Sequence, residues 1–309
     1  MEIEAGRGAT GSVRARALRR ISSHTVARLG AMLPVDDRTL PVARAVIDGT
    51  LRAVAPPLRG TGVREIAEGS VRGEWVYGPR VSRGDAVVLY VHGGGFVAGS
   101  ARSFRGVSSR LSQATGLPVF AMDYRLAPEH RSPAAVEDTA GAYRWLLNRG
   151  YSPSSIVVAG DSAGGYLAAD LVIANARNGL PAPAGLLLFS PMVGPGRSRH
   201  GRDGLLSPAL MRAAVSLFTD SPLTLPLAPG QALPPTLIQV SDSELLTADA
   251  IDFADRLRAL GTDCELQVWP GQIHVFQALA ALVPESRRAF AAVGDFVASR
   301  LDSVAAQAV

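Results

Sequence analysis

The sequence predicts a single α/β domain built on a mostly parallel sheet, and two observations lead to this prediction. Short runs of apolar and β-branched residues alternate along the chain with longer segments whose apolar residues recur at helical spacing. The 309 residues are 47% hydrophobic, which is enough to bury a large core within one domain. Strands joined through helices run parallel, so a central sheet flanked by helices is expected.

Each expected element rests on this alternation. The strands are short apolar runs, expected as a hairpin at residues 63–77 and then at 85–91, 118–123, 156–159, 184–189, 236–240 and 265–269. The helices carry apolar stripes and are bounded by glycine or proline; they are expected at residues 41–51, 107–116, 133–150, 166–177, 208–218 and 247–260 and around 290–301.

Residues 156–165, Ile-Val-Val-Ala-Gly-Asp-Ser-Ala-Gly-Gly, form the first candidate site. A buried apolar run ends at Gly160, and the next four residues complete the pattern G-x-S-x-G. Small residues in this pattern let the chain turn sharply and expose one serine hydroxyl. Ser162 is therefore the candidate nucleophile. A helix is expected to follow, so the N–H of Ala163 lies at a helix N-terminus, where it is suited to stabilise a developing negative charge.

The strand at 85–91 ends in His92-Gly-Gly-Gly-Phe96, a second stretch that suits the same chemistry. Glycine leaves the backbone open to a ligand, so the N–H groups of Gly94 and Gly95 are candidate donors to an oxyanion. His92 is expected to hold this loop by a structural hydrogen bond.

Four motifs together resemble the bacterial hormone-sensitive-lipase-like carboxylesterases of the α/β-hydrolase superfamily. The motifs are HGGGF at 92–96, DYRLAPEH at 123–130, GDSAGG at 160–165 and QIHVF at 272–276. The similarity extends from about Val63 to the C-terminus. It implies an α/β-hydrolase fold with a mostly parallel central sheet flanked by helices and covered by a helical cap.

The resemblance also implies a domain organisation. It assigns residues 1–60 to N-terminal cap helices and residues 61–309 to the catalytic domain. Residues 194–234, which are rich in Gly, Pro and Arg, interrupt the alternation of strands and helices. This segment is expected to contribute a second part of the cap.

A nucleophilic serine needs a base, because its hydroxyl is almost wholly protonated at neutral pH, and the base needs an acid to fix its ring. In α/β-hydrolases the chain order is serine, acid, histidine. Of the five histidines only His274, in the QIHVF motif, follows the last expected strand. His274 is therefore the candidate base.

Two carboxylates, Asp242 and Glu244, lie in one loop and are both candidates for the acid. Asp242 is the obvious choice by residue type. In the family the acid precedes x-Leu and lies close to thirty residues before the histidine; Glu244 meets both conditions and Asp242 meets neither. Glu244 is preferred, and the other carboxylate is expected to hydrogen-bond backbone in the same loop. Asp161, beside the candidate nucleophile, is expected to fasten a loop.

Composition argues against several other classes of protein. All 31 basic residues are arginine, and residues 1–30 contain six arginines and two glutamates, so they carry the whole net charge of +4 and nucleic-acid binding is not indicated. The sequence shows no metal-ligand cluster, phosphate-binding loop or dinucleotide fingerprint, so no cofactor is expected. The single cysteine, Cys264, suits a reducing cytoplasm. A homodimer is left open.

The N-terminal segment has two interpretations. Val13, Ala17 and Ile21 follow helical spacing among arginines, which indicates either a solvated basic helix or one that rests on an anionic membrane surface; the first is preferred. No stretch is apolar and long enough for a signal peptide or a spanning helix. We therefore expect a cytoplasmic protein without stable membrane insertion.

The resemblance and the candidate residues together predict a serine carboxylic-ester hydrolase that acts on short to medium acyl esters through an acyl-enzyme. A lactone, amide or carbamate hydrolase using the same residues is the first alternative. A non-enzymatic small-molecule receptor on the same fold is the second, and the presence of His274 argues against it.

Overall fold

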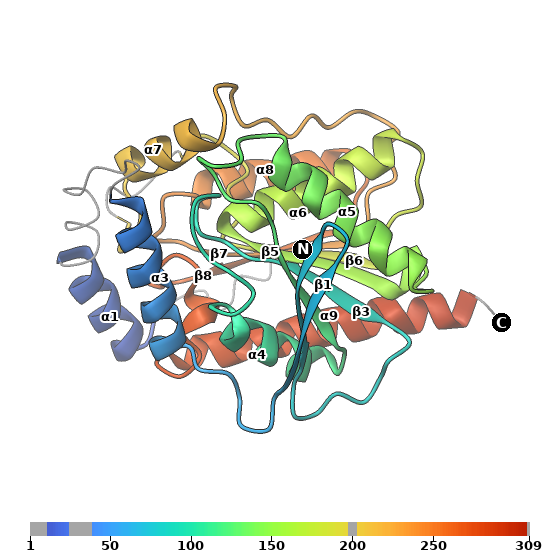
Figure 1. Cartoon of the computed structure of the whole chain (residues 1–309), viewed down its shortest axis with the longest axis horizontal. Helices are drawn as coiled ribbons and strands as arrows, with labels where there is room; N and C mark the ends of the chain where they lie inside the picture. The colour runs from blue at the N-terminus through green and yellow to red at the C-terminus, as the bar shows by residue number, and fades with distance from the viewer. Residues whose placement is uncertain (1–10, 25–38, 197–202, 308–309) are drawn as a thin grey trace.

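A computed structural model describes residues 11–24, 39–196 and 203–307 and contains one eight-stranded sheet between two layers of helices (Figure 1). The strand order is β1-β2-β4-β3-β5-β6-β7-β8. β2 pairs antiparallel with β1 and with β4, and every other pair is parallel, so the predicted mostly parallel α/β fold is confirmed. The strands are β1 (Gly62–Glu68), β2 (Val71–Tyr77), β3 (Val87–Val91), β4 (Val119–Asp123), β5 (Ile156–Asp161), β6 (Gly185–Phe189), β7 (Thr236–Ser241) and β8 (Cys264–Trp269).

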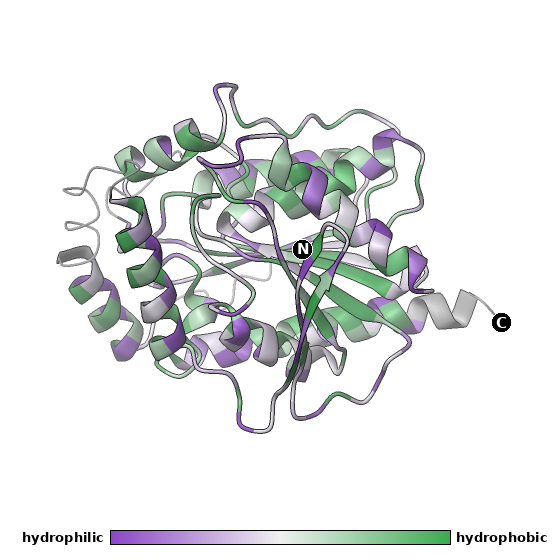
Figure 2. Ribbon diagram, in the orientation of Figure 1, coloured by the Kyte–Doolittle hydropathy of each residue, from purple (hydrophilic) through white to green (hydrophobic). Residues whose placement is uncertain are grey.

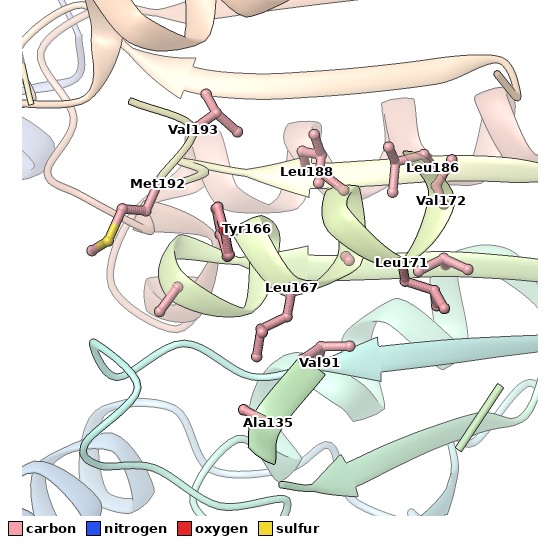
Figure 3. Close-up of a cluster of buried hydrophobic side chains, with 14 of the residues drawn as sticks. Val91, Ala135, Tyr166, Leu167, Leu171, Val172, Leu186, Leu188, Met192 and Val193 are labelled. Atoms are coloured by element: carbon pink, nitrogen blue, oxygen red, sulfur yellow. The ribbon is translucent and has the colours of Figure 1, made fainter. Parts of the chain in front are cut away.

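The central strands of the sheet are buried on both faces, which explains why they are continuous apolar runs (Figure 2). One face packs against α5 (Ala134–Asn148), α6 (Ser162–Arg177) and α8 (Thr247–Ala259), and the other against α4 (Arg105–Thr115) and α9 (Pro284–Gln307). Figure 3 shows the first of these cores, where Leu167 and Leu171 of α6 lie against the strands.

The expected hairpin and all the expected helices are present, and two of the boundary differences lie at the candidate site. The strand predicted to end at 159 continues to Asp161, because Gly160 and Asp161 still pair with residues of β6. The helix predicted from 166 begins at Ser162. The change from strand to helix takes place at Ser162 itself, whose backbone φ of 51° reverses the chain within one residue.

Three further helices lie outside the layers, namely α1 (Val13–His24), α3 (Leu40–Val54) and α7 (Pro208–Phe218). α7 packs on the loop that follows β3, where Phe218 stacks on Phe96 with ring centroids 4.0 Å apart. These helices fall in the segments expected to form a cap. Residues 1–10, 25–38 and 197–202 of those segments lie outside the described residues.

Candidate active site

Ser162 occupies a strained turn between β5 and α6. Its positive φ of 51° is uncommon for a residue with a side chain, and such strain persists only where the surrounding structure holds it. Gly160 and Gly164 allow the turn, because a side chain on Gly160 would meet the backbone of Gly164, and one on Gly164 would meet the carbonyl groups that end β3. The sharp turn places the Ser162 hydroxyl at the carboxyl edge of the sheet.

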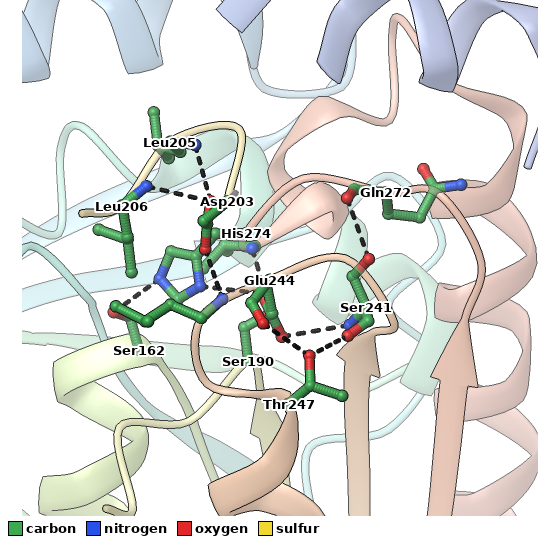
Figure 4. A network of polar contacts seen from close by, with 12 residues as sticks. Ser162, Ser190, Asp203, Leu205, Leu206, Ser241, Glu244, Thr247, Gln272 and His274 are labelled. Atoms are coloured by element: carbon green, nitrogen blue, oxygen red, sulfur yellow. Dashed lines mark hydrogen bonds and ion pairs between the residues drawn. The ribbon is translucent and has the colours of Figure 1, made fainter. Parts of the chain in front are cut away.

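The structure brings Ser162, His274 and Glu244 into one hydrogen-bonded row (Figure 4). His274 follows β8 and lies 112 residues beyond the serine in the chain. Its Nε2 is 2.9 Å from the Ser162 hydroxyl oxygen, and its Nδ1 is 2.9 Å from a carboxylate oxygen of Glu244. The three residues are 6%, 5% and 2% exposed, so the row is nearly shielded from water. This is the arrangement that lets a histidine take a proton from a serine.

Glu244 has further partners that hold its carboxylate in place. The backbone N–H of Ser241 donates to it at 3.1 Å, and the Ser190 side chain hydrogen-bonds it as well. Burial raises the pKa of Glu244, and its contact with His274 opposes that rise. For His274, burial lowers the pKa, but the hydrogen bond and negative charge of Glu244, together with the charges of Asp203 and Asp161, raise it by more, so the pKa lies above its ordinary value. The carboxylate therefore stabilises the protonated ring.

Asp242, the other carboxylate of this loop, points to a different partner. Its Oδ1 accepts from the backbone N–H of Gly271 at 2.7 Å and from the Ser243 hydroxyl. Gly271 belongs to the loop that carries His274, so Asp242 ties two neighbouring loops together instead of bonding backbone within its own loop, as the sequence had suggested.

The glycine loop after β3 adopts a conformation that only glycine accommodates easily. Gly94 has a φ of 111° and Gly95 a φ of 64°. The Gly94 carbonyl accepts from the N–H groups of Val97 and Ala98, which closes a tight turn. In the described part of the chain, neither the Gly94 nor the Gly95 N–H donates to a protein acceptor.

Asp161 and His92 hold this loop beside the nucleophile. The Asp161 carboxylate accepts from the N–H of Gly93 at 2.9 Å and from the Tyr90 hydroxyl. Burial raises the pKa of Asp161 to about 6, although both hydrogen bonds act to lower it. His92 is stacked on Tyr124 with ring centroids 4.4 Å apart, and its Nδ1 lies 2.7 Å from the carbonyl oxygen of Gly93. Both residues therefore have the structural contacts expected of them.

Two residues near the row were not anticipated from the sequence. Ser190 directly follows β6, accepts from the N–H of Val275 at 3.1 Å and hydrogen-bonds Glu244. Asp203 is buried and accepts from the N–H of Leu245, next to Glu244, at 2.7 Å. The position of Ser190 after the carboxyl end of a parallel strand could have pointed to it from the sequence. Asp203 lies in an irregular segment, where no sequence pattern points to it.

Neither a metal centre nor a membrane-spanning helix is found in the described residues. No group of three or more His, Cys, Asp or Glu side chains in them is arranged to hold a metal ion. Within the same residues, no helix combines the length and apolar character that crossing a bilayer needs.

Comparison with known proteins agrees with the fold and the motifs. Residues 88–278 match the family described as alpha/beta hydrolase fold. A carboxylesterase/phospholipase of Mycobacterium tuberculosis, LipF, is 36% identical over 280 residues, which cover 84% of this chain and 74% of that protein. An acetyl-hydrolase of Streptomyces hygroscopicus is 38% identical over 246 residues, covering 75% and 81%.

Solved structures give the same family. An esterase from the bacterial hormone-sensitive lipase family superposes with a TM-score of 0.83 at 34% identity, over 95% of this chain and all of that one. A hormone-sensitive lipase from a metagenome library superposes with a TM-score of 0.80 at 30% identity, over 91% and 98%. The chain therefore belongs to the α/β-hydrolase family and, within it, to the bacterial hormone-sensitive-lipase-like esterases.

Proposed function

We propose that this carboxylic-ester hydrolase cleaves short to medium acyl esters through a covalent acyl-enzyme formed on Ser162. The row of Ser162, His274 and Glu244, with its two contacts of 2.9 Å, is the observation that carries the proposal. The Ser162 oxygen attacks the ester carbonyl while its proton moves to Nε2 of His274, and the alcohol leaves with that proton. Water then attacks the acyl-enzyme by the same route and releases the acid. Glu244 orients the ring and stabilises its cation.

In this mechanism the N–H groups of Gly94, Gly95 and Ala163 stabilise the oxyanion of the tetrahedral intermediate. Among the described residues, the N–H groups of the two glycines have no protein acceptor, and Ala163 lies in the first turn of α6, where N–H groups have no partner within the helix. Losing one such donor typically lowers kcat by about 10²- to 10³-fold. The glycine loop is therefore expected to matter nearly as much as the row itself.

A serine-directed fluorophosphonate tests the proposed nucleophile. The full chain is expected to gain the mass of one phosphonyl group, located at Ser162 by peptide mapping, because the base makes this hydroxyl reactive. The Ser162→Ala variant is expected to stay unlabelled. A wild-type chain that remains unlabelled while it is folded would favour a receptor on this fold over an enzyme. Rates with lactone, amide and carbamate substrates would separate the remaining alternatives.

We also propose that α1, α3 and α7 form the cap over this site. Arg44 of α3 supports a link between cap and glycine loop, because its Nε donates to the carbonyl of Val97 at 2.6 Å and its guanidinium forms two hydrogen bonds of 2.7 Å with Glu129. The same guanidinium donates to the carbonyl of Ala127. Arg44 therefore acts as a positioning residue for the loop that presents Gly94.

Replacing Arg44 by methionine is expected to lower kcat by about tenfold to a hundredfold with less change in KM, because a small displacement of the oxyanion donors is costly to the transition state. Steady-state kinetics with p-nitrophenyl butyrate measure both constants. Arg52 is the matched control: it lies on the same helix and donates to the carbonyl of Asp48. If Arg44→Met and Arg52→Met lowered kcat equally, Arg44 would have no specific positioning role.

Three further expectations, on location, nucleic-acid binding and oligomeric state, remain proposals. The lone cysteine is buried and unpaired, which supports a cytoplasmic location. The small net charge of +4 supports the absence of nucleic-acid binding. A homodimer is a prediction that size-exclusion chromatography with light scattering would test.

A further inference from the structure

Helices α1 and α3 each expose large apolar side chains to solvent. On α1, Val13 is 72% and Ile21 is 61% exposed; on α3, Val42 is 65% and Val46 is 61% exposed. Ile47 of α3 is exposed as well, so five of the eight exposed large hydrophobic residues in the described chain lie on these two helices. Clustered exposure of large apolar side chains marks a surface that binds a membrane or another molecule.

The stripe on α1 is additional to the side with which this helix packs. Val13, Ala17 and Ile21 are four residues apart, so they lie along one side of the helix, and all three are exposed. Ala15 and Leu18 lie on the opposite side, in a buried cluster beneath the helix. The helix is therefore apolar on two sides. One side packs in the core, and the outer stripe is exposed to solvent.

α3 repeats this arrangement beside α1 (Figure 1). Leu40 is buried and Val54 packs into the same cluster as Ala15, which places the two helices on one patch of core. Val42 and Val46 lie on the side turned away from these contacts. Figure 2 shows apolar residues along both helices, interspersed with hydrophilic ones. We call Val13, Ala17, Ile21, Val42 and Val46 the α1–α3 surface.

Charge identifies the occupant that suits this surface. Helix α1 has no acidic residue, and its exposed Arg14, Arg16 and Arg20 border the stripe, the first on one side and the other two on the opposite side. An apolar stripe bordered by arginines is the pattern of a helix that lies in the headgroup region of an anionic bilayer. A second copy of this chain would bring one arginine-rich face against another, which is electrostatically unfavourable.

We propose that the α1–α3 surface binds reversibly to a membrane that contains anionic lipids, with the valines and Ile21 at the level of the headgroups and Arg14 beside the lipid phosphates. The surface binds without crossing the bilayer. This inference goes beyond the proposed hydrolysis and does not depend on it, because binding requires none of Ser162, His274 or Glu244.

Co-sedimentation with vesicles tests the proposal, using the full chain with Ser162→Ala so that hydrolysis does not interfere. Binding is expected to vesicles of phosphatidylcholine mixed with phosphatidylglycerol, to be much weaker with phosphatidylcholine alone, and to fall in high salt. Combining Val42→Ser with Val46→Ser is expected to weaken binding by at least about tenfold. Arg14→Gln is expected to weaken it about fivefold.

Two matched variants control for the general effect of losing an exposed apolar side chain or an exposed arginine. Leu180→Ser removes a side chain that is 51% exposed beyond the C-terminal end of α6, and Arg64→Gln removes an exposed charge on β1; both are expected to bind like the parent. Circular dichroism checks the fold of every variant. Failure of the parent to bind anionic vesicles, or equal weakening by the controls, would overturn the proposal. A parent dimer that Val42→Ser and Val46→Ser convert to a monomer would assign the surface to a second copy instead.

Discussion

Replacing either Ser162 or His274 by alanine is expected to lower kcat for p-nitrophenyl butyrate by about 10⁴- to 10⁶-fold. The serine supplies the bond-forming oxygen, and the histidine removes its proton across 2.9 Å, so neither residue acts without the other. For the same reason the double variant is expected to lose no more than either single variant. Initial rates at saturating substrate measure the effect.

The control for these variants is a buried serine that lies outside the candidate site. Ser108 of α4 is fully buried, and its hydroxyl has no hydrogen-bond partner among the described residues. Ser108→Ala is therefore expected to keep full turnover. Thermal unfolding separates lost chemistry from lost structure in each variant. If Ser162→Ala or His274→Ala retained a tenth of the parental turnover, that residue would not be part of the catalytic machinery.

Local features of the fold were predictable because each depends on a few neighbouring residues. Small residues around Ser162 predict a sharp turn, and the turn is present at that residue with its positive φ. The apolar runs predict strands buried on both faces, and the spacing of Phe290, Val293 and Val297 predicts the last helix, which packs these residues in the core. In each case the physical cause lies within about ten residues of chain.

Contacts between distant residues could not be predicted in this way. Arg44 meets Glu129 across 85 positions of chain, and Asp203 meets Leu245 across 42, so no spacing in the sequence signals either contact. The helical spacing of Val13, Ala17 and Ile21 among arginines was visible, but spacing alone does not say whether such a helix is solvated or rests on a membrane surface. The structure shows that this stripe faces outward.

The acid is a case in which residue type and spacing disagree. Aspartate is the commoner residue for the role, yet the spacing to the histidine favours Glu244, which lies 30 residues before His274. A glutamate has one more methylene group than an aspartate and reaches further from its loop. Glu244 lies 2.9 Å from Nδ1 of His274, while Asp242 accepts from Gly271.

Replacing Glu244 by glutamine is expected to lower kcat by about 10⁴-fold while the fold is retained, because an amide N–H can face Nδ1 of His274 and favour the wrong tautomer. Asp242→Asn is the matched control. Asparagine keeps an oxygen that accepts from the N–H of Gly271, so kcat is expected to change by less than about tenfold. Steady-state kinetics and thermal unfolding of the two variants test this, and the reverse ranking would reassign the acid to Asp242.

The pH profile gives a second, independent measure of the same assignment. His274 must be neutral to accept the serine proton, so kcat/KM falls as pH drops through the pKa of this residue. Burial lowers that pKa and Glu244 raises it.

Glu244→Gln removes the negative charge and leaves the ring buried, so the acid limb of the residual activity is expected to move to lower pH. Asp242→Asn is expected to leave the limb in place, because its carboxylate contacts Gly271 and Ser243 instead of the ring. A limb that moved in Asp242→Asn and stayed fixed in Glu244→Gln would show that Asp242 is the group coupled to the histidine.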